Sequence, residues 1–278
     1  MDIKLIALDL DGTLTNEEKV ITPYTYDVLM EAQRQGIRLC LASGRPPYGM
    51  RPLAKQLRMA EYGGMLICYN GGHIEDCQTG RVYVEKALDE ALLPTLLDFQ
   101  ELSGMTLMTY YEDHIYTQKP DDRYVRQSSK NNNMAIRKVE DFLSEVPRPL
   151  NKCLMVGDPE IRPHWERTMK EALGDRMNVM HSTPYFIELL PPNIDKGPSL
   201  MELARQLGMT AENVIAFGDS YNDIGMIRLA GTGVAMGNAE DTVKAAADFI
   251  TKSNEEDGVG DFLSTRVLKN KWKVISNK

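Results

Sequence analysis

Short apolar runs alternate with longer amphipathic stretches in the first part of the chain. Residues 3–8 are almost continuously apolar, as expected of a strand that is buried on both faces. Thr22 and Pro23 then supply an N-cap and a first helical residue, and Gly36 supplies a helix end. The elements predicted in this way are a strand at 3–8, a helix at 23–35, a strand at 37–42, a helix at 48–58 and a strand at 65–69. This alternation is typical of a parallel α/β sheet.

The same alternation returns towards the C-terminal end of the chain. The elements predicted there are a helix at 198–207, a strand at 214–217, a helix at 221–229 and strands at 233–236 and 248–250. The intervening residues differ in character; they contain a helix near 88–102, an aromatic strand-like run at 108–116, a polar stretch at 128–133 and a strand at 152–156. We therefore predict one α/β core, formed by 1–83 and 190–278, that is interrupted by an inserted domain at 84–189.

Composition and charge exclude several classes of protein. With 278 residues, of which 42% are hydrophobic, the chain is long enough to bury a large core. The formal net charge of −8 argues against a nucleic-acid partner, because such a partner requires a basic surface. No apolar segment approaches the ~20 residues of a membrane helix, and the N-terminus lacks the pattern of a leader peptide. We expect a soluble, cytoplasmic protein without nucleic-acid or membrane partners.

The four cysteines are Cys40, Cys68, Cys77 and Cys153, and their spacing is not that of a metal site. Cys40 and Cys68 fall within predicted strands, so buried thiols are the simplest interpretation. This usage fits a reducing compartment.

Two carboxylates follow the first strand, in the sequence Asp-Leu-Asp-Gly-Thr that begins at Asp9. Strand alternation would put Asp9 and Asp11 on the same face at the carboxyl end of the strand, where open parallel sheets bind ligands. Like charges this close repel each other unless a cation neutralises them. Taken alone, the segment is also explained by a solvated strand end with an Asp-Gly turn.

Ser43, Gly44 and Arg45 close the second strand. A hydroxyl followed by glycine can present Oγ and backbone N–H groups to a phosphate, although an ordinary turn or cap serine explains the same residues. Lys196 stands immediately before a predicted helix and, taken alone, is typical of a solvated surface.

A third polar segment, Gly-Asp-Ser-Tyr-Asn-Asp, runs from Gly218 to Asp223 after the strand at 214–217. Helix capping by Asp219 or Ser220 would account for it. Asp219 at a second strand end would also supply another hard oxygen ligand, the type that Mg²⁺ prefers.

In this order, the four segments resemble the motif set of the haloacid dehalogenase superfamily over the whole length of the chain. An insert between the serine and lysine motifs is similar to subclass IIB, the Cof-type phosphatases. Finer matches to that subclass are the segments Tyr69–Gly72, Asp195–Gly197, Val234–Ala239 and Ser253–Val259. The resemblance implies a Rossmann-like doubly wound parallel-sheet core with an inserted α/β cap. It also implies a phosphatase that acts on small phosphorylated metabolites, sugar phosphates in particular.

The resemblance also implies catalytic roles. Asp9 would attack phosphorus and form an aspartyl phosphate, and Asp11 would protonate the leaving oxygen and then activate water. Ser43 would hydrogen-bond the phosphoryl group, and Lys196 would neutralise both that group and Asp9. Phosphoryl transfer depends on positioning and charge neutralisation, which agrees with these assignments.

A Mg²⁺ cofactor is implied in the same way. Asp9, Asp219 and the backbone carbonyl of Asp11 would be its ligands. The other matched residues expected to bind phosphate or to support the site are Gly44, Arg45, Asn70, Asn222 and Asp223. Whether Asp223 contacts the metal directly or through water is left open.

The insert would cover the site and recognise the rest of the substrate. Tyr185, Glu188 and Arg162 are candidates for this contact, but residues of these types are more often structural or solvated. Two alternatives to a phosphatase stay open: a sugar phosphomutase or phosphotransferase of the same subclass, and a binding protein that accepts phosphate or senses sugar phosphates. A monomer or a small homo-oligomer is expected, and the sequence does not name the substrate.

Overall fold

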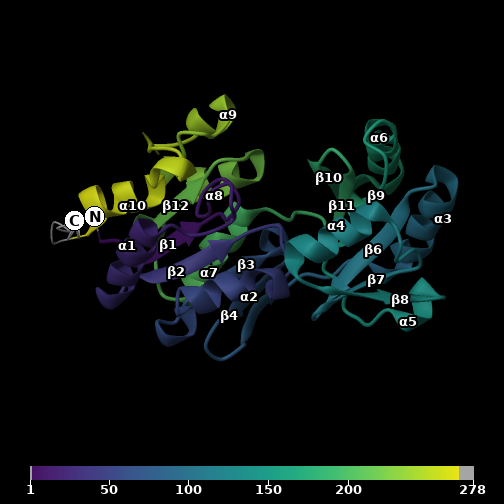
Figure 1. Cartoon of the computed structure of the whole chain (residues 1–278), viewed down its shortest axis with the longest axis horizontal. Helices are drawn as coiled ribbons and strands as arrows, with labels where there is room; N and C mark the ends of the chain where they lie inside the picture. The colour runs from purple at the N-terminus through teal and green to yellow at the C-terminus, as the bar shows by residue number, and fades with distance from the viewer. Residues whose placement is uncertain (1, 269–278) are drawn as a thin grey trace. The chain divides into compact units, whose positions relative to one another are not determined.

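The computed structural model describes residues 2–268, which form two compact units (Figure 1). The core unit runs from the N-terminus to Gly44, from Leu53 to Tyr83, and from Asp195 onward. The insert unit contains Arg45–Pro52 and Val84–Ile194. Each unit has its own sheet and is described separately.

Within the described residues, the core unit is built on a sheet with the strand order β14-β13-β12-β1-β2-β3-β4-β5. The strands are β1 (Leu5–Leu8), β2 (Arg38–Ala42), β3 (Met65–Cys68), β4 (His73–Asp76), β5 (Val82–Glu85), β12 (Val214–Gly218), β13 (Thr232–Ala235) and β14 (Phe249–Ile250). Neighbours from β14 to β3 pair in parallel, whereas β4 is antiparallel to β3. The strand β1 lies between β12 and β2, so the ends of β1 and β12 are adjacent.

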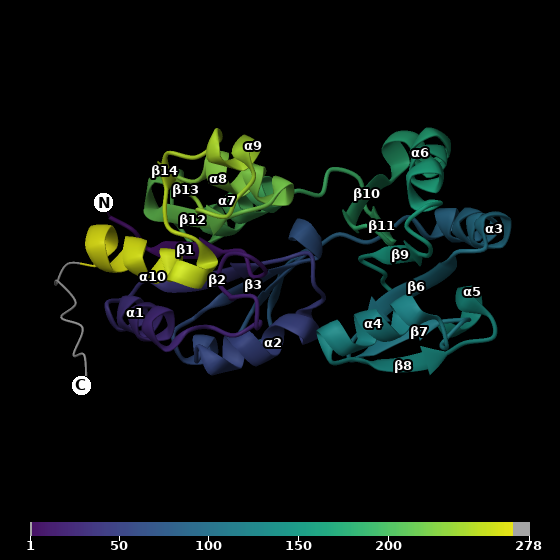
Figure 2. The same ribbon diagram turned by 45° about the horizontal axis from the view of Figure 1, so that its top comes forward.

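Helices cover both faces of this sheet. They are α1 (Pro23–Arg34), α7 (Lys196–Gln206), α8 (Ile224–Leu229), α9 (Asp241–Lys244) and α10 (Gly258–Phe262). The helix α2 (Pro47–Gln56) is divided between the units, because its residues up to Pro52 are grouped with the insert unit. Figure 2 shows α1 and α10 on one side and α7 and α8 on the other. Short helical turns complete the unit: η1 (Met59–Glu61), η2 (Tyr69–Gly71), η5 (Ala211–Asn213), η6 (Tyr221–Asp223), η7 (Asn254–Glu256) and the π-helical η8 (Leu263–Val267).

The insert unit contains a mixed sheet with the order β10-β11-β9-β6-β7-β8. Its strands are β6 (Thr106–Tyr111), β7 (His114–Thr117), β8 (Ala135–Lys138), β9 (Cys153–Val156), β10 (Asn178–Thr183) and β11 (Phe186–Leu190). Its helices are η3 (Glu90–Leu92), α3 (Leu93–Ser103), α4 (Arg123–Asn132), α5 (Phe142–Glu145), α6 (Arg162–Leu173) and η4 (Gly174–Arg176).

Strand alternation gives the two faces of the insert sheet different partners. Leu107 and Cys153 point to the face where α3, α5 and α6 supply a continuous apolar cluster. Tyr110 points to the opposite face, where its hydroxyl lies 2.8 Å from the Ser128 hydroxyl of α4. Both faces are therefore packed within the insert unit itself.

The predicted fold class is confirmed, because a largely parallel core sheet with helices on both faces accompanies a separate α/β insert. The predicted core elements agree with the structure to within about three residues at their ends, the usual uncertainty of such boundaries. The single strand-like run predicted at 108–116 is wrong. It is a hairpin of β6 and β7, and the chain turns at Glu112, where φ is +49°.

Two further expectations concern burial and membranes. The thiols of Cys40, Cys68 and Cys153 are buried, as predicted, and Cys77 is half-buried. None of the helices between residues 2 and 268 has both the length and the apolar character needed to span a bilayer.

Candidate active site

The centre of the candidate site is a buried lysine between two carboxylates. Asp9 directly follows β1, whose four residues are all buried, and its own side chain is almost completely covered. Lys196 is the first residue of α7, and this helix begins there because the Asp195 carboxylate caps it by accepting the Gly197 N–H at 2.7 Å. Lys196 Nζ donates to Asp9 Oδ1 at 2.6 Å and to Asp223 Oδ1 at 2.7 Å. The lysine side chain is 0% exposed, so both contacts are shielded from water.

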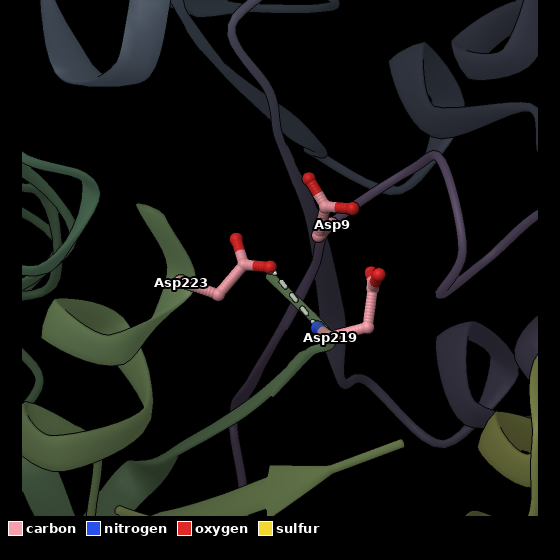
Figure 3. Close-up of side chains that lie close together, drawn as sticks. All are labelled: Asp9, Asp219 and Asp223. Atoms are coloured by element: carbon pink, nitrogen blue, oxygen red, sulfur yellow. Dashed lines mark hydrogen bonds between the residues drawn. The ribbon is translucent and has the colours of Figure 1, made fainter. Parts of the chain in front are cut away.

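Two further carboxylates follow strand β12. Asp223 belongs to the turn η6, and its Oδ2 accepts the backbone N–H of Asp219 at 3.0 Å (Figure 3). The same oxygen accepts the backbone N–H of Ser220 at 3.0 Å. Asp219 Oδ1 accepts the Thr13 hydroxyl at 2.7 Å. One ligand oxygen from each of Asp9, Asp219 and Asp223 lies within 4.8 Å of the others. The structure thus brings three carboxylates and one ammonium group together from three separate segments of the core unit.

The cluster carries more negative than positive charge. Burial, together with the negative charges of Asp223 and Asp219, raises the pKa of Asp9 to about 8 against the opposing effect of Lys196. Burial also raises the pKa of Asp219, although its hydrogen bond from Thr13 works in the opposite direction. Burial alone would lower the pKa of Lys196, but the carboxylates of Asp223 and Asp9 outweigh it and the pKa is raised. Lys196 is therefore a fixed cation that does not neutralise the site by itself.

This donor set fits a divalent cation with a preference for oxygen ligands. Three carboxylates converge without histidine or cysteine, as expected for Mg²⁺ rather than for zinc or copper. Both oxygens of Asp223 already accept hydrogen bonds, from Lys196 and from two backbone N–H groups. Asp9 and Asp219 are consequently the better candidates for direct ligands, and Asp223 holds the lysine and the turn in place.

Asp11 is placed differently from the other aspartates. Its side chain is 40% exposed, and Oδ1 pairs with Lys19 Nζ at 2.9 Å. Lys19 has a left-handed backbone (φ 62°), and its N–H donates to the Asn16 carbonyl within the turn after the first motif. An ion pair this exposed contributes less than about 1 kcal/mol.

The serine motif and its predicted neighbours lie at the ends of β2 and β3. Ser43 is buried, its N–H donates to the Ile67 carbonyl at 2.9 Å, and its carbonyl accepts the Asn70 N–H at 3.0 Å. The Asn222 side chain donates to Asn70 Oδ1 at 3.0 Å. Gly44 adjoins the Asn70 amide. Arg45 is half-buried and belongs to the insert unit.

Residues from the two C-terminal matched segments hold the loop after β1. Asn238 Nδ2 donates to the Gly12 carbonyl at 2.8 Å, and Asn254 Nδ2 donates to the Thr15 carbonyl at 2.9 Å. The Asn254 N–H also donates to Asn238 Oδ1 at 3.1 Å, which joins the two side chains. These contacts fix the backbone on the C-terminal side of Asp11.

The substrate candidates of the insert have structural partners. Tyr185 stacks on Tyr124 with ring centroids 4.8 Å apart. Glu188 is buried and lies 2.8 Å from Lys152 Nζ. Arg162 donates to the Glu166 carboxylate and to the Pro184 carbonyl. Their predicted contact with a substrate stays a prediction.

Several contacts at the site were not predicted. Thr13 lies in the first motif, so its hydroxyl could have been proposed as a partner of a nearby carboxylate. Lys19 gave no signal, because one lysine in a polar turn has many possible partners. Asn238 and Asn254 were visible as parts of matched segments, but their carbonyl partners depend on the packing of distant loops.

Comparison with known proteins agrees with this geometry. A family model described as haloacid dehalogenase-like hydrolase matches residues 6–263. The chain belongs to this family. The match spans the whole insert unit and most of the core unit.

Named relatives of this hydrolase are phosphatases. The chain is 33% identical to the 5-amino-6-(5-phospho-D-ribitylamino)uracil phosphatase YcsE of Bacillus subtilis, over 96% of this chain and 97% of the relative. It is 27% identical to the pyridoxal phosphate phosphatase YbhA of Escherichia coli, over 96% of this chain and 100% of the relative. A crystal structure of a haloacid dehalogenase-like hydrolase from Bacteroides thetaiotaomicron matches with a TM-score of 0.90 and 47% identity, over 93% of this chain and 97% of that one.

These findings confirm the predicted family and the predicted enzyme class, a phosphoric monoester hydrolase. Asp9, Lys196, Asp219 and Asp223 therefore form a cluster in a protein of a phosphatase family.

Proposed function

We propose that this hydrolase cleaves small phosphate monoesters, sugar phosphates in particular, through an aspartyl phosphate on Asp9 and with Mg²⁺ as its cofactor. The observation that supports this most directly is the buried Lys196, which contacts Asp9 and Asp223 while Asp219 completes a cluster within 4.8 Å. A surplus of buried negative charge suits a site whose ligands are a metal cation and, with it, a phosphate.

In the first step, a carboxylate oxygen of Asp9 attacks phosphorus and the bond between phosphorus and the leaving oxygen breaks. Lys196 already donates to Asp9 Oδ1, which leaves Oδ2 to act as the nucleophile. Within the described residues, Lys196 uses two of its three ammonium N–H groups, in the hydrogen bonds to Asp9 and Asp223. The third N–H group is available for a phosphoryl oxygen. Ser43 supplies a hydroxyl donor to the same group.

Asp11 handles the proton. It gives a proton to the leaving oxygen in the first step, and then takes one from the water that attacks phosphorus in the second. The bond between phosphorus and Asp9 breaks in that second step, which restores the Asp9 carboxylate and releases phosphate.

Asp9 and Asp219, together with the backbone carbonyl of Asp11, would hold Mg²⁺. When bound, the ion neutralises the charge that otherwise opposes the approach of a carboxylate to a phosphate. Asp223 would keep Lys196 and the Asp219 backbone in position, as its hydrogen bonds already do.

The substrate class rests on the relatives and on the insert. YcsE and YbhA are named for small phosphorylated metabolites, which supports a substrate of that size here. Residues 84–189 would select the leaving group, because the catalytic cluster lies outside them. Exchanging this segment with that of a relative should reorder the preferred substrates without changing the metal requirement. A cytoplasmic location stays a prediction that rests on the cysteine usage. The oligomeric state, a monomer or a small homo-oligomer, also stays a prediction.

The test is a panel of phosphate monoesters, with nitrophenyl phosphate as a reference, measured with Mg²⁺ and with a chelator. Turnover that requires Mg²⁺ and favours sugar phosphates would support the proposal. Full activity in chelator would exclude the cofactor. Transfer of the phosphoryl group to a second sugar instead of water would indicate a phosphomutase, and a stable phosphoprotein without turnover would indicate a binding protein.

A further inference from the structure

The turn after β3 has an unusual backbone. Three consecutive residues have positive φ angles: 52° at Tyr69, 57° at Asn70 and 107° at Gly71. All three are buried. A left-handed conformation is unfavourable for a residue with a side chain, and most of all for a large one such as tyrosine. Such a conformation persists only where surrounding contacts impose it.

The first of these contacts is with the serine motif. The Asn70 N–H donates to the Ser43 carbonyl at 3.0 Å. A Cβ atom on Gly44 would lie only 3.2 Å from Asn70 Nδ2, so the asparagine amide packs directly against the glycine backbone. Asn70 therefore contacts the backbone on the C-terminal side of the Ser43 hydroxyl.

The second contact is with the segment after β12. Asn222 Nδ2 donates to Asn70 Oδ1 at 3.0 Å, across 152 positions of sequence. Asn222 immediately precedes Asp223, which accepts a hydrogen bond from Lys196. The Asn70 side chain thus connects the serine motif to the acidic turn.

The third contact is with the start of α7. The Gly71 carbonyl accepts the Ser199 hydroxyl at 3.1 Å, one helical turn after Lys196. A Cβ atom on Gly71 would lie 2.4 Å from Ser199 Oγ and 2.7 Å from the Asp195 carbonyl oxygen. The approach of the turn to α7 therefore requires glycine at this position, in addition to the positive φ angle.

We propose that the turn Tyr69–Gly71 is a positioning element that sets the spacing of Ser43, Lys196 and Asn222. Asn70 is its central residue, and it acts through these neighbours rather than by contact with the reacting atoms. The inference rests on the proposed function, since it assigns the turn a role in phosphoryl transfer. The strained backbone serves to aim the Asn70 amide at Asn222 while its N–H stays on Ser43.

Substituting glycine separates the side chain from the backbone. Gly adopts positive φ without a penalty, so Asn70→Gly should fold and keep the turn while losing the bond to Asn222. We expect kcat for nitrophenyl phosphate to fall about tenfold, KM to change less than about threefold, and the melting temperature to fall by no more than about 5 °C, because relief of the positive φ angle offsets part of the lost amide contact. Asn133→Gly is the matched control, because Asn133 is left-handed as well (φ 52°) but ends α4 in the insert unit. That variant should keep the wild-type kcat.

A double-mutant cycle tests the contact itself. Asn70→Gly, Asn222→Ala and the double variant are compared at saturating Mg²⁺. If the two amides act as one unit, the double variant should be no more than about twofold worse than the more damaged single variant. Losses that multiply would overturn the coupling.

Other outcomes also decide the question. If Asn70→Gly kept a kcat within twofold of wild type, the inference about the turn would be overturned. The proposed function would be unaffected, because the wild-type protein would still be active. A loss of activity together with a fall in melting temperature of more than about 10 °C would also overturn the inference, because the turn would then be merely structural. Wild-type protein that hydrolysed no phosphate ester would overturn the proposed function and this inference together.

Discussion

The two units each contain a charged cluster, and the clusters are opposite in composition. In the core unit, one buried ammonium group, Lys196, lies among three carboxylates. In the insert unit, one buried carboxylate, Glu166, lies among three basic side chains. The central charge is covered in both, so neither is an ordinary surface ion pair.

The pKa values of Asp9 and Glu166 are shifted in opposite directions. The pKa of Asp9 is raised to about 8 by burial and by its acidic neighbours, in spite of Lys196. Burial would also raise the pKa of Glu166, but the hydrogen bonds from Lys170 and His181 outweigh it and the pKa is lowered. The neighbours of Glu166 stabilise its negative charge, whereas the surroundings of Asp9 stabilise its negative charge only in part.

This difference separates a candidate site from a structural contact. A buried carboxylate whose neighbours stabilise its charge strengthens the fold and asks for no ligand. A group of buried carboxylates with too few cations is destabilising unless a ligand supplies the missing charge. Charge balance therefore supports the cluster of the core unit, rather than that of the insert unit, as the candidate site.

The largest expected effect is the loss of turnover in Asp9→Asn. The amide cannot act as a nucleophile, so kcat should fall on the order of 10⁴-fold, as for other covalent catalysts that lose their nucleophile. Steady-state hydrolysis of nitrophenyl phosphate with Mg²⁺ measures it, and circular dichroism checks the fold. Near-normal kcat in a folded variant would show that Asp9 is not the nucleophile.

The same variant should change how stability depends on pH. Because the pKa of Asp9 is raised on folding, native protein binds more protons than unfolded protein between about pH 4 and pH 8, and its stability falls as pH rises. Asn carries no charge at this position. The free energy of unfolding of Asp9→Asn should therefore rise relative to that of the wild type as pH rises from 5 to 8, by at most about 4 kcal/mol. Urea unfolding in chelator measures the difference, and adding Mg²⁺ should restore the wild type. A constant difference would indicate that Asp9 is well stabilised without a cation.

Much of the core cluster could be predicted from the sequence, because parallel strands place their carboxyl ends at one edge of a sheet. Asp9 and Asp219 each follow a buried strand, and Lys196 precedes a helix, so their convergence follows once β1 and β12 are neighbours. The position of Asp11 was less predictable. Strand alternation stops applying once the chain turns after Asp9, and the ion pair with Lys19 depends on that turn.

Parts of the structure had no clear signal in the sequence. The hairpin of β6 and β7 turns at Glu112-Asp113, and without glycine or proline this turn leaves the aromatic run looking continuous. The left-handed conformation of Tyr69 is imposed by contacts with distant segments, so no local rule predicts it. For Glu166, the spacing to Arg162 and Lys170 does predict two contacts on one helix face, whereas His181 comes from a neighbouring strand.

A smaller effect separates proton transfer from the charge cluster. Asp11→Asn keeps the backbone carbonyl but cannot protonate a leaving alkoxide, which needs a proton far more than nitrophenolate does. In single turnovers, formation of the phosphoenzyme should slow by about 10²-fold for a sugar phosphate and much less for nitrophenyl phosphate. Ser43→Ala is the control and should slow both substrates alike, since Ser43 would contact the shared phosphoryl group. Equal slowing of both substrates by Asp11→Asn would contradict the general-acid role.

The smallest effect concerns the cluster in the insert unit. Glu166→Gln removes the anion that Lys170 contacts at 2.6 Å and that Arg162 and His181 also contact. It should destabilise the insert unit by about 1 kcal/mol, because hydrogen bonds to a charged group are lost while the half-exposed Lys170 and His181 can still be hydrated. Unfolding in urea can be followed by the fluorescence of Trp165 on α6, in a background where Trp272 is replaced by phenylalanine. Lys170→Met is the matched control, and because half of the lysine is exposed it should cost less.

The pH dependence of this variant should be the reverse of that predicted for Asp9→Asn. The pKa of Glu166 is lowered on folding. The Glu166 carboxylate therefore stabilises the fold fully above its ordinary pKa of 4.5, and this stabilisation is lost as pH falls through the lowered pKa. The difference in the free energy of unfolding between wild type and Glu166→Gln should therefore become smaller as the pH is lowered. Because the cluster is structural, kcat/KM for nitrophenyl phosphate should stay within about twofold of wild type. A tenfold loss of kcat in a folded Glu166→Gln protein would mean that the insert cluster also takes part in the chemistry, and charge balance would no longer distinguish the two units.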